Sequence, residues 1–386
     1  MNFSRHSCCG KRFLTGFFKF PLIQGVALSI FSSMFRKRYA PLIGLDISSS
    51  SVKLVELALD DQNRYTLVRA AIEPLEKGAI TDGNIEKHDD VVDAVRKLIK
   101  KSGTKTKHVA LALPSSAVIS KKIVLPGDLR EEEIEVQVET EANQYIPFAI
   151  EDVALDFSVL GPSLNSPGDQ EVLIAASRRD KVLDRQTIAE AAGLKPQIID
   201  IDAFASRLAA GRLIERLPRG GHDLLVALFE IGASSTSMQV LRNGETLYDR
   251  DQTFGGQQLT QAIARHYGFS QEEAEAKKRN ADLPDDYTAQ VLEPFIEGMA
   301  QELARALQFF FRATPNSKVD YILLAGGTAA LPGLVEKITQ LTSTACVVLN
   351  PFEGMAIGDQ VREKKLRLQA PSYLTSCGLA MRRFLQ

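Results

Sequence analysis

The 386-residue sequence has no tryptophan, only four cysteines and five histidines, and a formal net charge of −2. The cysteines show neither metal-binding nor disulfide spacing, which is typical of a protein in a reducing compartment. The histidines do not cluster, so they indicate no metal site. The nearly balanced charge argues against a general nucleic-acid-binding protein. We therefore expect a cytoplasmic protein without a nucleic-acid partner.

Long hydrophobic runs are also lacking. The apolar stretch near the N-terminus, Phe20–Phe35, is shorter than the ~20 residues that a membrane-spanning helix needs, and the basic cluster Arg36–Arg38 follows it. That cluster fits a signal-peptide cleavage region poorly. We expect residues 1–41 to be an N-terminal extension outside the core. The alternatives are a translation start at Met34, a disordered or membrane-touching extension at residues 1–33, and a working signal peptide there.

The composition is otherwise that of an ordinary globular protein, and the length suggests two or three domains. The chain is organised around residues 42–59, where an apolar run carries Asp46 near its end, four serines follow, and an alternating run carries Lys53. Two such runs joined by small residues predict a hairpin. Its turn offers N–H groups and hydroxyls to phosphate oxygens, and its carboxylate suits hydrated magnesium. The simpler alternatives are a serine-rich turn without a ligand and a solvent-facing lysine.

A similar pattern lies 184 residues further on, in Leu224–Val240. An apolar run there carries Glu230 near its end, and a turn of small residues, 232–236, leads into a second alternating run. A third signal is the apolar run from Tyr321 that ends in Gly326-Gly327, where a ligand can approach the backbone closely. Two similar halves, each with a loop of this kind, predict a cleft with one loop on each wall.

The patterns between these loops predict mixed α/β halves. In the first half we expect a strand at Arg64–Ile72, a helix at Asp89–Lys101 and a strand at His108–Leu113. Residues 115–197 read as an inserted unit with a helix at Arg130–Tyr145 between strands. The chain then returns to the core with a strand at Gln197–Ala203. Two carboxylates in this strand, Asp200 and Asp202, are candidates for orienting water, and the alternative for Asp202 is a helix cap.

In the second half, Asn243-Gly244 predicts a type I′ hairpin turn. Helices are expected at Gly255–Gly268, after the capping-box pattern of Ser270, and along Thr288–Arg312, whose apolar stripe reads as a packing face. A last helix, Ser372–Phe384, contains Gly378, which would allow close packing.

Five segments in a fixed order resemble the actin-like ATPase superfamily, and within it the PilM family of type IV pilus assembly proteins. They are GLDISSSSVKLVEL from Gly44, EIGASST from Glu230, FGGQQLT from Phe254, SQEEAEAKK from Ser270 and LAGGTAALPGL from Leu324. The resemblance covers the chain from about Met34 to its C-terminus. It implies an α/β fold with a duplicated actin-like (ribonuclease H-like) core and an inserted IC subdomain like that of FtsA.

The resemblance also implies a division of the chain. The expected parts are the first half-domain IA at 42–114 with a return at 198–222, IC at 115–197, the second half-domain IIA at 223–269 and 318–371, the helical subdomain IIB at 270–317, and a C-terminal helix at 372–386 lying back on IA.

By the same resemblance the cofactor is ATP with Mg²⁺, the metal held by Asp46 and Glu230 through water, and Glu275 and Lys278 reach the ribose and adenine. A salt-bridged helix face is the alternative for these last two residues. The expected cofactor-binding residues are Asp46, Ser48, Ser49, Ser50, Ser51, Lys53, Glu230, Gly232, Ala233, Ser234, Gly255, Gly256, Glu275, Lys278, Gly326, Gly327 and Thr328.

One position departs from the family, which normally has aspartate where this chain has Glu230. The extra methylene carries the carboxylate about an ångström further, a distance to which catalytic geometry is sensitive. We therefore expect ATP binding with slow or absent hydrolysis.

The resemblance implies a scaffold at the inner membrane. Its expected partners are the cytoplasmic N-terminal peptide of a PilN-type membrane protein, held in a groove between IA and IC, and other proteins of the pilus assembly platform. Self-association is left open. The alternatives are a small-molecule kinase of the same fold and an FtsA-like division protein.

Overall fold

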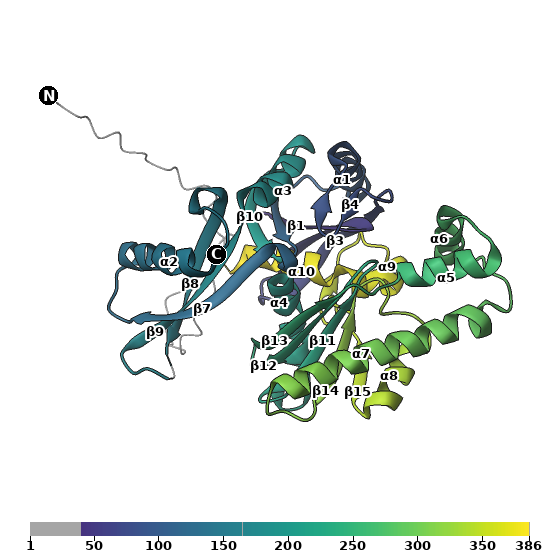
Figure 1. Ribbon diagram of the computed structural model, residues 1–386. Coiled ribbons are helices and arrows are strands. Elements are labelled where there is room, and N and C mark those ends of the chain that lie inside the picture. Colours follow the sequence, from purple (N-terminus) through teal and green to yellow (C-terminus); the bar gives the residue numbers. More distant parts are fainter. Residues whose placement is uncertain (1–39, 164, 386) are drawn as a thin grey trace.

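The computed structural model describes residues 40–163 and 165–385 (Figure 1). The expectations for residues 1–39 lie outside this range. Two large sheets and one small three-stranded sheet account for most of the strands. A short hairpin of β4 (Ile80–Thr81) and β5 (Asn84–Ile85) is added in the first half.

The first sheet is built on the predicted hairpin. The strands β1 (Ile43–Ser48) and β2 (Ser51–Leu59) pair antiparallel, and β3 (Tyr65–Pro74) continues the sheet beyond β2. On the other side of β1, β6 (His108–Leu113) and β10 (Lys195–Ile201) run parallel to it. The carboxyl ends of these three strands therefore meet at one edge, together with the serine turn.

Helices cover both faces of this sheet. Alternate residues of β1, with α1 (His88–Ser102) and α3 (Arg179–Ala191), form one apolar core. The opposite face packs against α4 (Asp202–Ile214) and α10 (Leu374–Met381). Side chains alternate along a strand, so Asp46 lies on the face of Gly44, which contacts α10.

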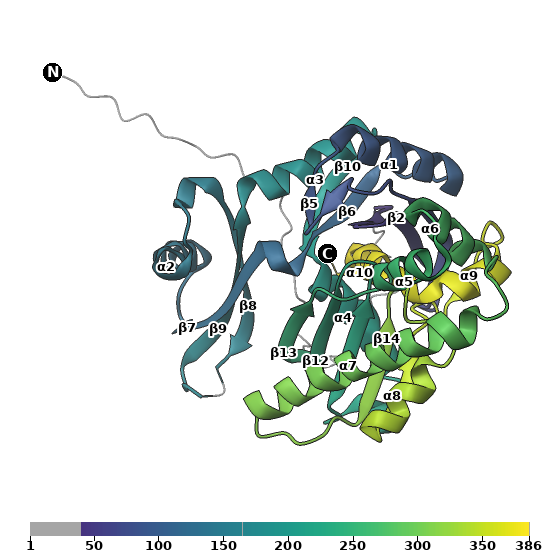
Figure 2. The same ribbon diagram turned by 45° about the vertical axis from the view of Figure 1, so that its right-hand side comes forward.

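The inserted unit is a separate layer, seen at the left of Figures 1 and 2. Its sheet has the order β7-β9-β8 and packs on α2 (Glu131–Tyr145). The strands are β7 (Val118–Pro126), β8 (Val153–Pro162) and β9 (Asp169–Arg178). The helix α3, which we predicted inside this unit, packs in the core of the first half, because Val182, Ile188 and Ala189 face α1 and β6.

The second half repeats the arrangement of the first. Here β11 (Val226–Ile231) is antiparallel to β12 (Thr236–Arg242) and parallel to β14 (Tyr321–Ala325), as β1 is to β2 and β6. The outer strands are β13 (Glu245–Gln252) and β15 (Ala345–Val348). The duplicated core that we expected is therefore confirmed.

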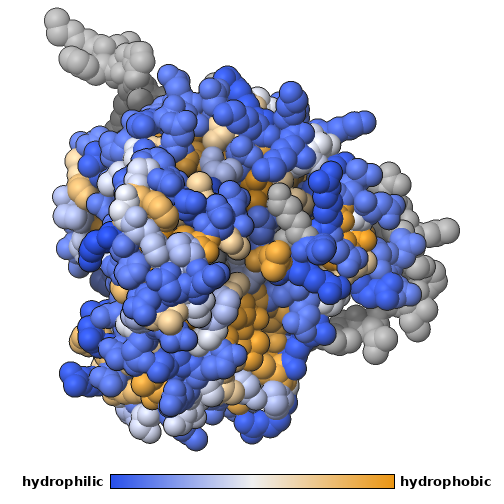
Figure 3. All heavy atoms as spheres, turned by 90° about the vertical axis from the view of Figure 1, so that its right-hand side faces the viewer, coloured by the Kyte–Doolittle hydropathy of each residue, from blue (hydrophilic) through white to orange (hydrophobic). Residues whose placement is uncertain are grey.

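Helices on one side of this second sheet form its core. They are α5 (Gln257–Tyr267), α6 (Gln271–Asn280), a π-helical turn (Thr288–Leu292) continued by α7 (Glu293–Ala313), and α8 (Leu334–Thr342). The apolar stripe of the long helix is a packing face, as predicted. Seen from the side of these helices, the surface is mainly hydrophilic, with an apolar area in its lower half (Figure 3).

The C-terminal segment crosses from one half to the other. The short strand β16 (Ala356–Ile357) pairs with β3 of the first sheet, although we assigned it to the second half. It is followed by α9 (Glu363–Gln369) and α10. Short 3₁₀ helices lie at Ser115–Ala117, Ile150–Asp152, Pro218–Gly221, Ala370–Tyr373 and Arg382–Phe384. No helix within residues 40–163 and 165–385 is long and apolar enough to cross a membrane.

Gly378 allows α10 to lie against α4, as predicted, because a β-carbon there would collide with the backbone carbonyl of Ala205. We expect Gly378→Ala to lower the free energy of unfolding by ~1–3 kcal/mol through overpacking. Gly298→Ala, in the open middle of α7, is the control and should raise it by ~0.5–1 kcal/mol. Urea titrations measure both; equal effects of the two changes would contradict this account of the α4–α10 contact.

Candidate functional site

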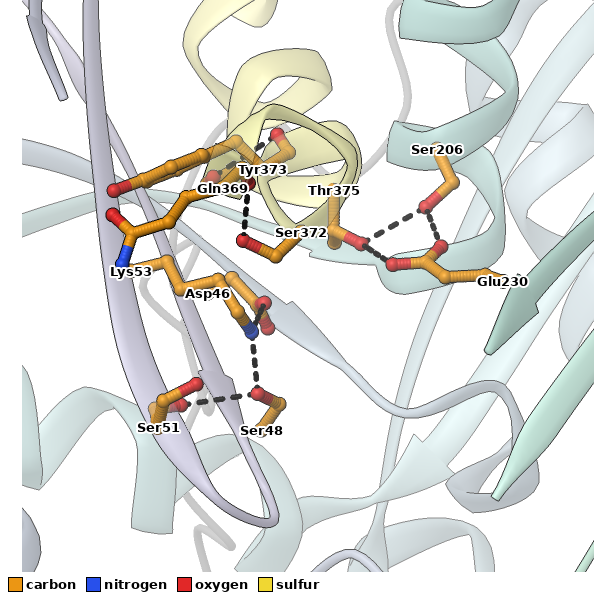
Figure 4. A network of polar contacts seen from close by, with 11 residues as sticks. Asp46, Ser48, Ser51, Lys53, Ser206, Glu230, Gln369, Ser372, Tyr373 and Thr375 are labelled. Carbon is orange, nitrogen blue, oxygen red and sulfur yellow. Dashed lines mark hydrogen bonds and ion pairs between the residues drawn. The ribbon is translucent and has the colours of Figure 1, made fainter. Parts of the chain in front are cut away.

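The predicted serine turn lies over a buried ion pair. The Nζ atom of Lys53 lies 2.7 Å from Oδ2 of Asp46, its cross-strand neighbour, and donates to Oγ of Ser48 at 2.6 Å (Figure 4). Ser48 in turn donates to the carbonyl of Ser51 at 3.0 Å. The lysine is only 8% exposed, so the alternative of a solvent-facing lysine is wrong. The turn thus has a positive group fixed directly beneath its hydroxyls.

The second predicted loop touches the first. The hydroxyl of Ser234, on the turn between β11 and β12, donates to the hydroxyl of Ser49 at 3.0 Å. These residues are 185 positions apart and belong to the two repeated halves. The loops that we placed on opposite walls of a cleft therefore lie within hydrogen-bond distance.

The glycine-containing segments of the second half gather behind Ser234. The carbonyl of Gly232 accepts the Gly256 N–H at 3.0 Å and the Thr328 hydroxyl at 2.9 Å. The carbonyl of Ala233 accepts from Gln257 at 2.8 Å. These contacts unite three predicted segments, around residues 232, 255 and 327, into one cluster of loops. Backbone N–H groups of these segments, including those of Gly232, Gly256 and Gln257, donate to carbonyls within the cluster and so hold its loops together.

Two glycines in this cluster are fixed by packing. Gly326 has a φ of +90°, and a β-carbon there would collide with the backbone of Ile231. A β-carbon at Gly255 would lie 2.6 Å from the carbonyl oxygen of Ala233. Gly327, in contrast, is exposed at the rim of the cluster. At Gly326 the close approach is made by the backbone of Ile231, and the approach of a ligand to the backbone, which we predicted for Gly326-Gly327, remains a prediction.

Glu230 lies at the end of β11 and is held by two helices. Its Oε2 accepts the Ser206 hydroxyl of α4 at 2.6 Å, and its Oε1 accepts the Thr375 hydroxyl of α10 at 2.7 Å (Figure 4). Burial raises the pKa of Glu230, and the charge of Asp46 adds to this effect. The longer side chain thus reaches α4 and α10, whereas we expected it to carry the carboxylate about an ångström further into the cleft.

The two carboxylates near the junction of β10 and α4 have different environments. Asp200 is fully buried and pairs with Arg382, at 2.5 Å from Nε and 3.0 Å from the terminal nitrogen. This ion pair connects β10 with the C-terminal segment, so the structure does not place Asp200 for orienting water in the cleft.

Asp202 is the first residue of α4. Its Oδ1 accepts the backbone N–H of Ser115 at 2.9 Å, that of Ala203 at 2.6 Å and the Ser115 hydroxyl. Ile201 occupies the cap position, so the carboxylate links α4 to the start of the insertion. Burial raises the pKa of Asp202 to about 7, and the Glu230 charge also raises it.

Glu275 and Lys278 form a network between α5 and α6. They pair at 2.6 Å, Arg279 pairs with Glu275 at 2.7 Å, and the Thr260 hydroxyl of α5 bonds to both at 2.6 and 2.7 Å. The salt-bridged face that we considered is therefore present, and contact with a nucleotide remains a prediction.

The sequence analysis missed two residues of the site, Ser206 and Thr375. Both lie in helices with mostly apolar sequences, where no local pattern marks them as functional.

A hollow of about 610 Å³ lies where the insertion meets α3. Phe148 and Leu183 line it and are 44% and 45% exposed. The other lining residues are Pro147, Ala149, Asp152, Arg178, Arg179 and Asp180. We call it the α3 groove. It lies between the first half and the insertion, where the sequence led us to expect a groove.

Within the described residues, no three His, Cys, Asp or Glu side chains cluster as a metal site. The predicted magnesium contacts, Asp46 and Glu230, are two carboxylates that need water and phosphate oxygens to complete a coordination shell.

Comparison with known proteins identifies a family and, among many similar solved structures, the following two. The sequence profile of a family described as "Type IV pilus assembly protein PilM" matches residues 44–384. A solved "PilM-PilN type IV pilus biogenesis complex" has a TM-score of 0.74 and 29% identity, covering 90% of this chain and 99% of that one. The ethanolamine utilization protein EutJ from Carboxydothermus hydrogenoformans has a TM-score of 0.53 and 16% identity, covering 90% of each chain.

The raised pKa of Asp202 predicts a pH-dependent stability. The folded protein binds the Asp202 proton more tightly than the unfolded chain does. The contribution of this proton to the free energy of unfolding is therefore fully present below about pH 4 and is lost as the pH rises through 7. Asp202→Asn keeps the Oδ1 acceptor without the charge. We expect the urea midpoint of the variant minus that of the wild type to be larger at pH 8 than at pH 5. The same difference at both pH values would show that Asp202 is ionised throughout.

Proposed function

The chain belongs to the PilM family of type IV pilus assembly proteins, and from this premise we propose that it is an ATP-binding scaffold of the pilus assembly platform. The observation that carries the nucleotide part is the contact of Ser49 with Ser234 above the buried Lys53–Asp46 pair. One loop from each half thus brings a serine hydroxyl to the same place, where phosphate oxygens would bind. An ATP molecule bound there would connect the two halves.

The residues present suit magnesium-ATP. Lys53 would direct its positive charge to phosphate oxygens once they replace part of its contact with Asp46, and hydroxyls of the loops at Ser48–Ser51 and Gly232–Ser234 would supply neutral donors. Asp46 would hold the hydrated metal through water, with Glu230 as the second carboxylate. Magnesium, when bound, would neutralise phosphate charge. Glu275 and Lys278 would lie at the nucleoside end.

We propose that hydrolysis is slow. Both Glu230 oxygens already accept hydroxyl hydrogen bonds, and Asp200 is paired with Arg382. Asp202 is the remaining candidate to orient water, and its Oδ1 accepts three hydrogen bonds. Few free carboxylate oxygens are left to orient an attacking water molecule, so bound ATP would act mainly as a structural link.

The α3 groove is the proposed partner site. The related solved complex contains PilN, and we propose that the groove takes the cytoplasmic N-terminal peptide of a PilN-type inner-membrane protein. Phe148 and Leu183 would provide apolar contacts, and Asp152 suits the positive charge of a peptide amino terminus. Asp180 already pairs with Arg178 at 2.7 Å, and Arg179 also lines the groove. The protein would then lie peripherally on the cytoplasmic side of the inner membrane, where other platform proteins and further copies of the chain are candidate partners. The kinase and division-protein alternatives are not favoured, because the pilus-family match spans residues 44–384.

The nucleotide proposal predicts a specific effect of Asp46→Asn, which retains an oxygen for the Lys53 hydrogen bond. Contacts to charged groups are worth ~1.5–3 kcal/mol, so magnesium-ATP affinity should fall by about 10- to 100-fold. Asp60→Asn, at the far end of the same hairpin, should leave it unchanged. Titration calorimetry measures both. Unchanged affinity in the Asp46 variant would exclude this carboxylate from the site.

The partner proposal predicts that Phe148→Ala weakens binding of the PilN N-terminal peptide at least tenfold and leaves magnesium-ATP binding unaltered. The control is Val136→Ala on α2, because Val136 is also exposed in the inserted unit but does not line the groove. Fluorescence anisotropy with a labelled peptide measures both. Equal peptide affinity in wild type and the Phe148 variant would exclude the α3 groove as the docking site.

A further inference from the structure

Helix α3 lies between the two proposed binding sites. Its first two turns line the α3 groove through Arg179, Asp180 and Leu183. The same helix packs against α1, β6 and β10 of the first half. Two of these elements, β6 and β10, end at the edge of the sheet that carries the serine turn. A rigid helix therefore connects the groove with the nucleotide end of the sheet.

Arg185 is the unusual residue of this helix. It follows Leu183 by two positions and is only 4% exposed, although the neighbouring side chains Val182, Ile188 and Ala189 belong to an apolar core. One terminal nitrogen donates to the carbonyl of Gly83 at 3.0 Å. Its Nε is buried and has no hydrogen-bond partner among the residues that the structure describes. A buried donor without a hydrogen-bond partner is rare in folded proteins, so the presence of a guanidinium group at this core position requires a physical explanation.

The charges acting on Arg185 point to the nucleotide end. Burial lowers the pKa of Arg185, and the carboxylates of Asp184, Asp46 and Asp202 oppose this effect by favouring the charged form. Asp46 belongs to the serine hairpin and Asp202 to the start of α4. Asp184 lies on α3 itself, where His88 of α1 is 3.7 Å away. Arg185 thus interacts electrostatically with two of the carboxylates in the proposed nucleotide site.

We propose that Arg185 is a positioning residue that couples occupation of the α3 groove to nucleotide binding at the serine hairpin. This inference rests on the proposed function of both sites. A peptide that presses on Leu183 displaces α3, and the helix carries Arg185 with it. The displacement changes the strength of the electrostatic interaction between the guanidinium group and the carboxylates of Asp46 and Asp202. Coupling needs a second arrangement of the helix, and one in which Nε gains a hydrogen-bond partner would relieve the cost of burying this donor.

The test measures thermodynamic coupling in the full-length protein. Calorimetry gives the affinity for Mg²⁺ and the non-hydrolysable analogue AMPPNP, with and without saturating PilN N-terminal peptide. We expect the peptide to change this affinity at least fivefold in wild type, and AMPPNP to change the peptide affinity by the same factor, because linkage is reciprocal. In Arg185→Met both ligands should still bind, and the factor by which one ligand changes the affinity for the other should fall below about 1.5.

Matched variants separate coupling from general damage. Lys181→Met removes a positive charge from the same helix outside the buried core and should keep the wild-type factor. Arg185→Lys keeps the charge but not the planar group of donors, and should give an intermediate factor. It also serves as the second variant if Arg185→Met does not fold.

The outcomes distinguish this inference from the proposed function. Both ligands binding to wild type without coupling would overturn the inference alone, as would full coupling in both Arg185 variants. Failure of wild type to bind either ligand would overturn the proposed function and the inference with it.

Discussion

The hydrogen bonds that the Glu230 carboxylate accepts from Ser206 and Thr375 hold the two halves in register. They join β11 of the second sheet to α4 and α10, the two helices that lie against the first sheet. Hydrogen bonds to a charged acceptor are worth ~1.5–3 kcal/mol, about twice those between neutral groups. Glu230 ends the strand that leads into the Ser234 loop, so this connection also anchors the loop that contacts Ser49. The buried Asp200–Arg382 pair fixes the other end of the same layer, and breaking such a pair by removing one partner costs ~3–5 kcal/mol.

A consequence is that the polar groups between the halves serve two purposes. Asp46 and Lys53 neutralise each other on the face toward α10, which allows both to be buried without ligand. The same pair lies beneath the hydroxyls that would meet phosphate oxygens. Magnesium-ATP would exchange some of these internal contacts for its own. Nucleotide binding would then reinforce a connection between the halves that the protein already makes.

The sequence predicts features that depend on local spacing. The β1–β2 hairpin, the Asn243-Gly244 turn with positive φ at both residues, and the role of Gly378 follow from short patterns. The partners of Glu230 do not, because Ser206 and Thr375 lie 24 and 145 positions away in helices whose patterns are apolar. The placement of α3 could not be predicted either, since an apolar helix face does not specify which sheet it covers. A two-residue strand such as β16 is too short to show the alternation of apolar and polar residues that identifies a strand in a sequence.

The central claim is that bound ATP is a lasting link between the two halves. The most direct measurement is the fate of one equivalent of magnesium-ATP in an excess of the full-length protein, sampled over time and analysed by chromatography after acid quenching. Typical enzymes complete a turnover in a second or less. The account predicts that the nucleotide stays bound as ATP for many minutes. Conversion to ADP within seconds would contradict it and would require an efficient catalytic group where Glu230 and Asp200 are already engaged.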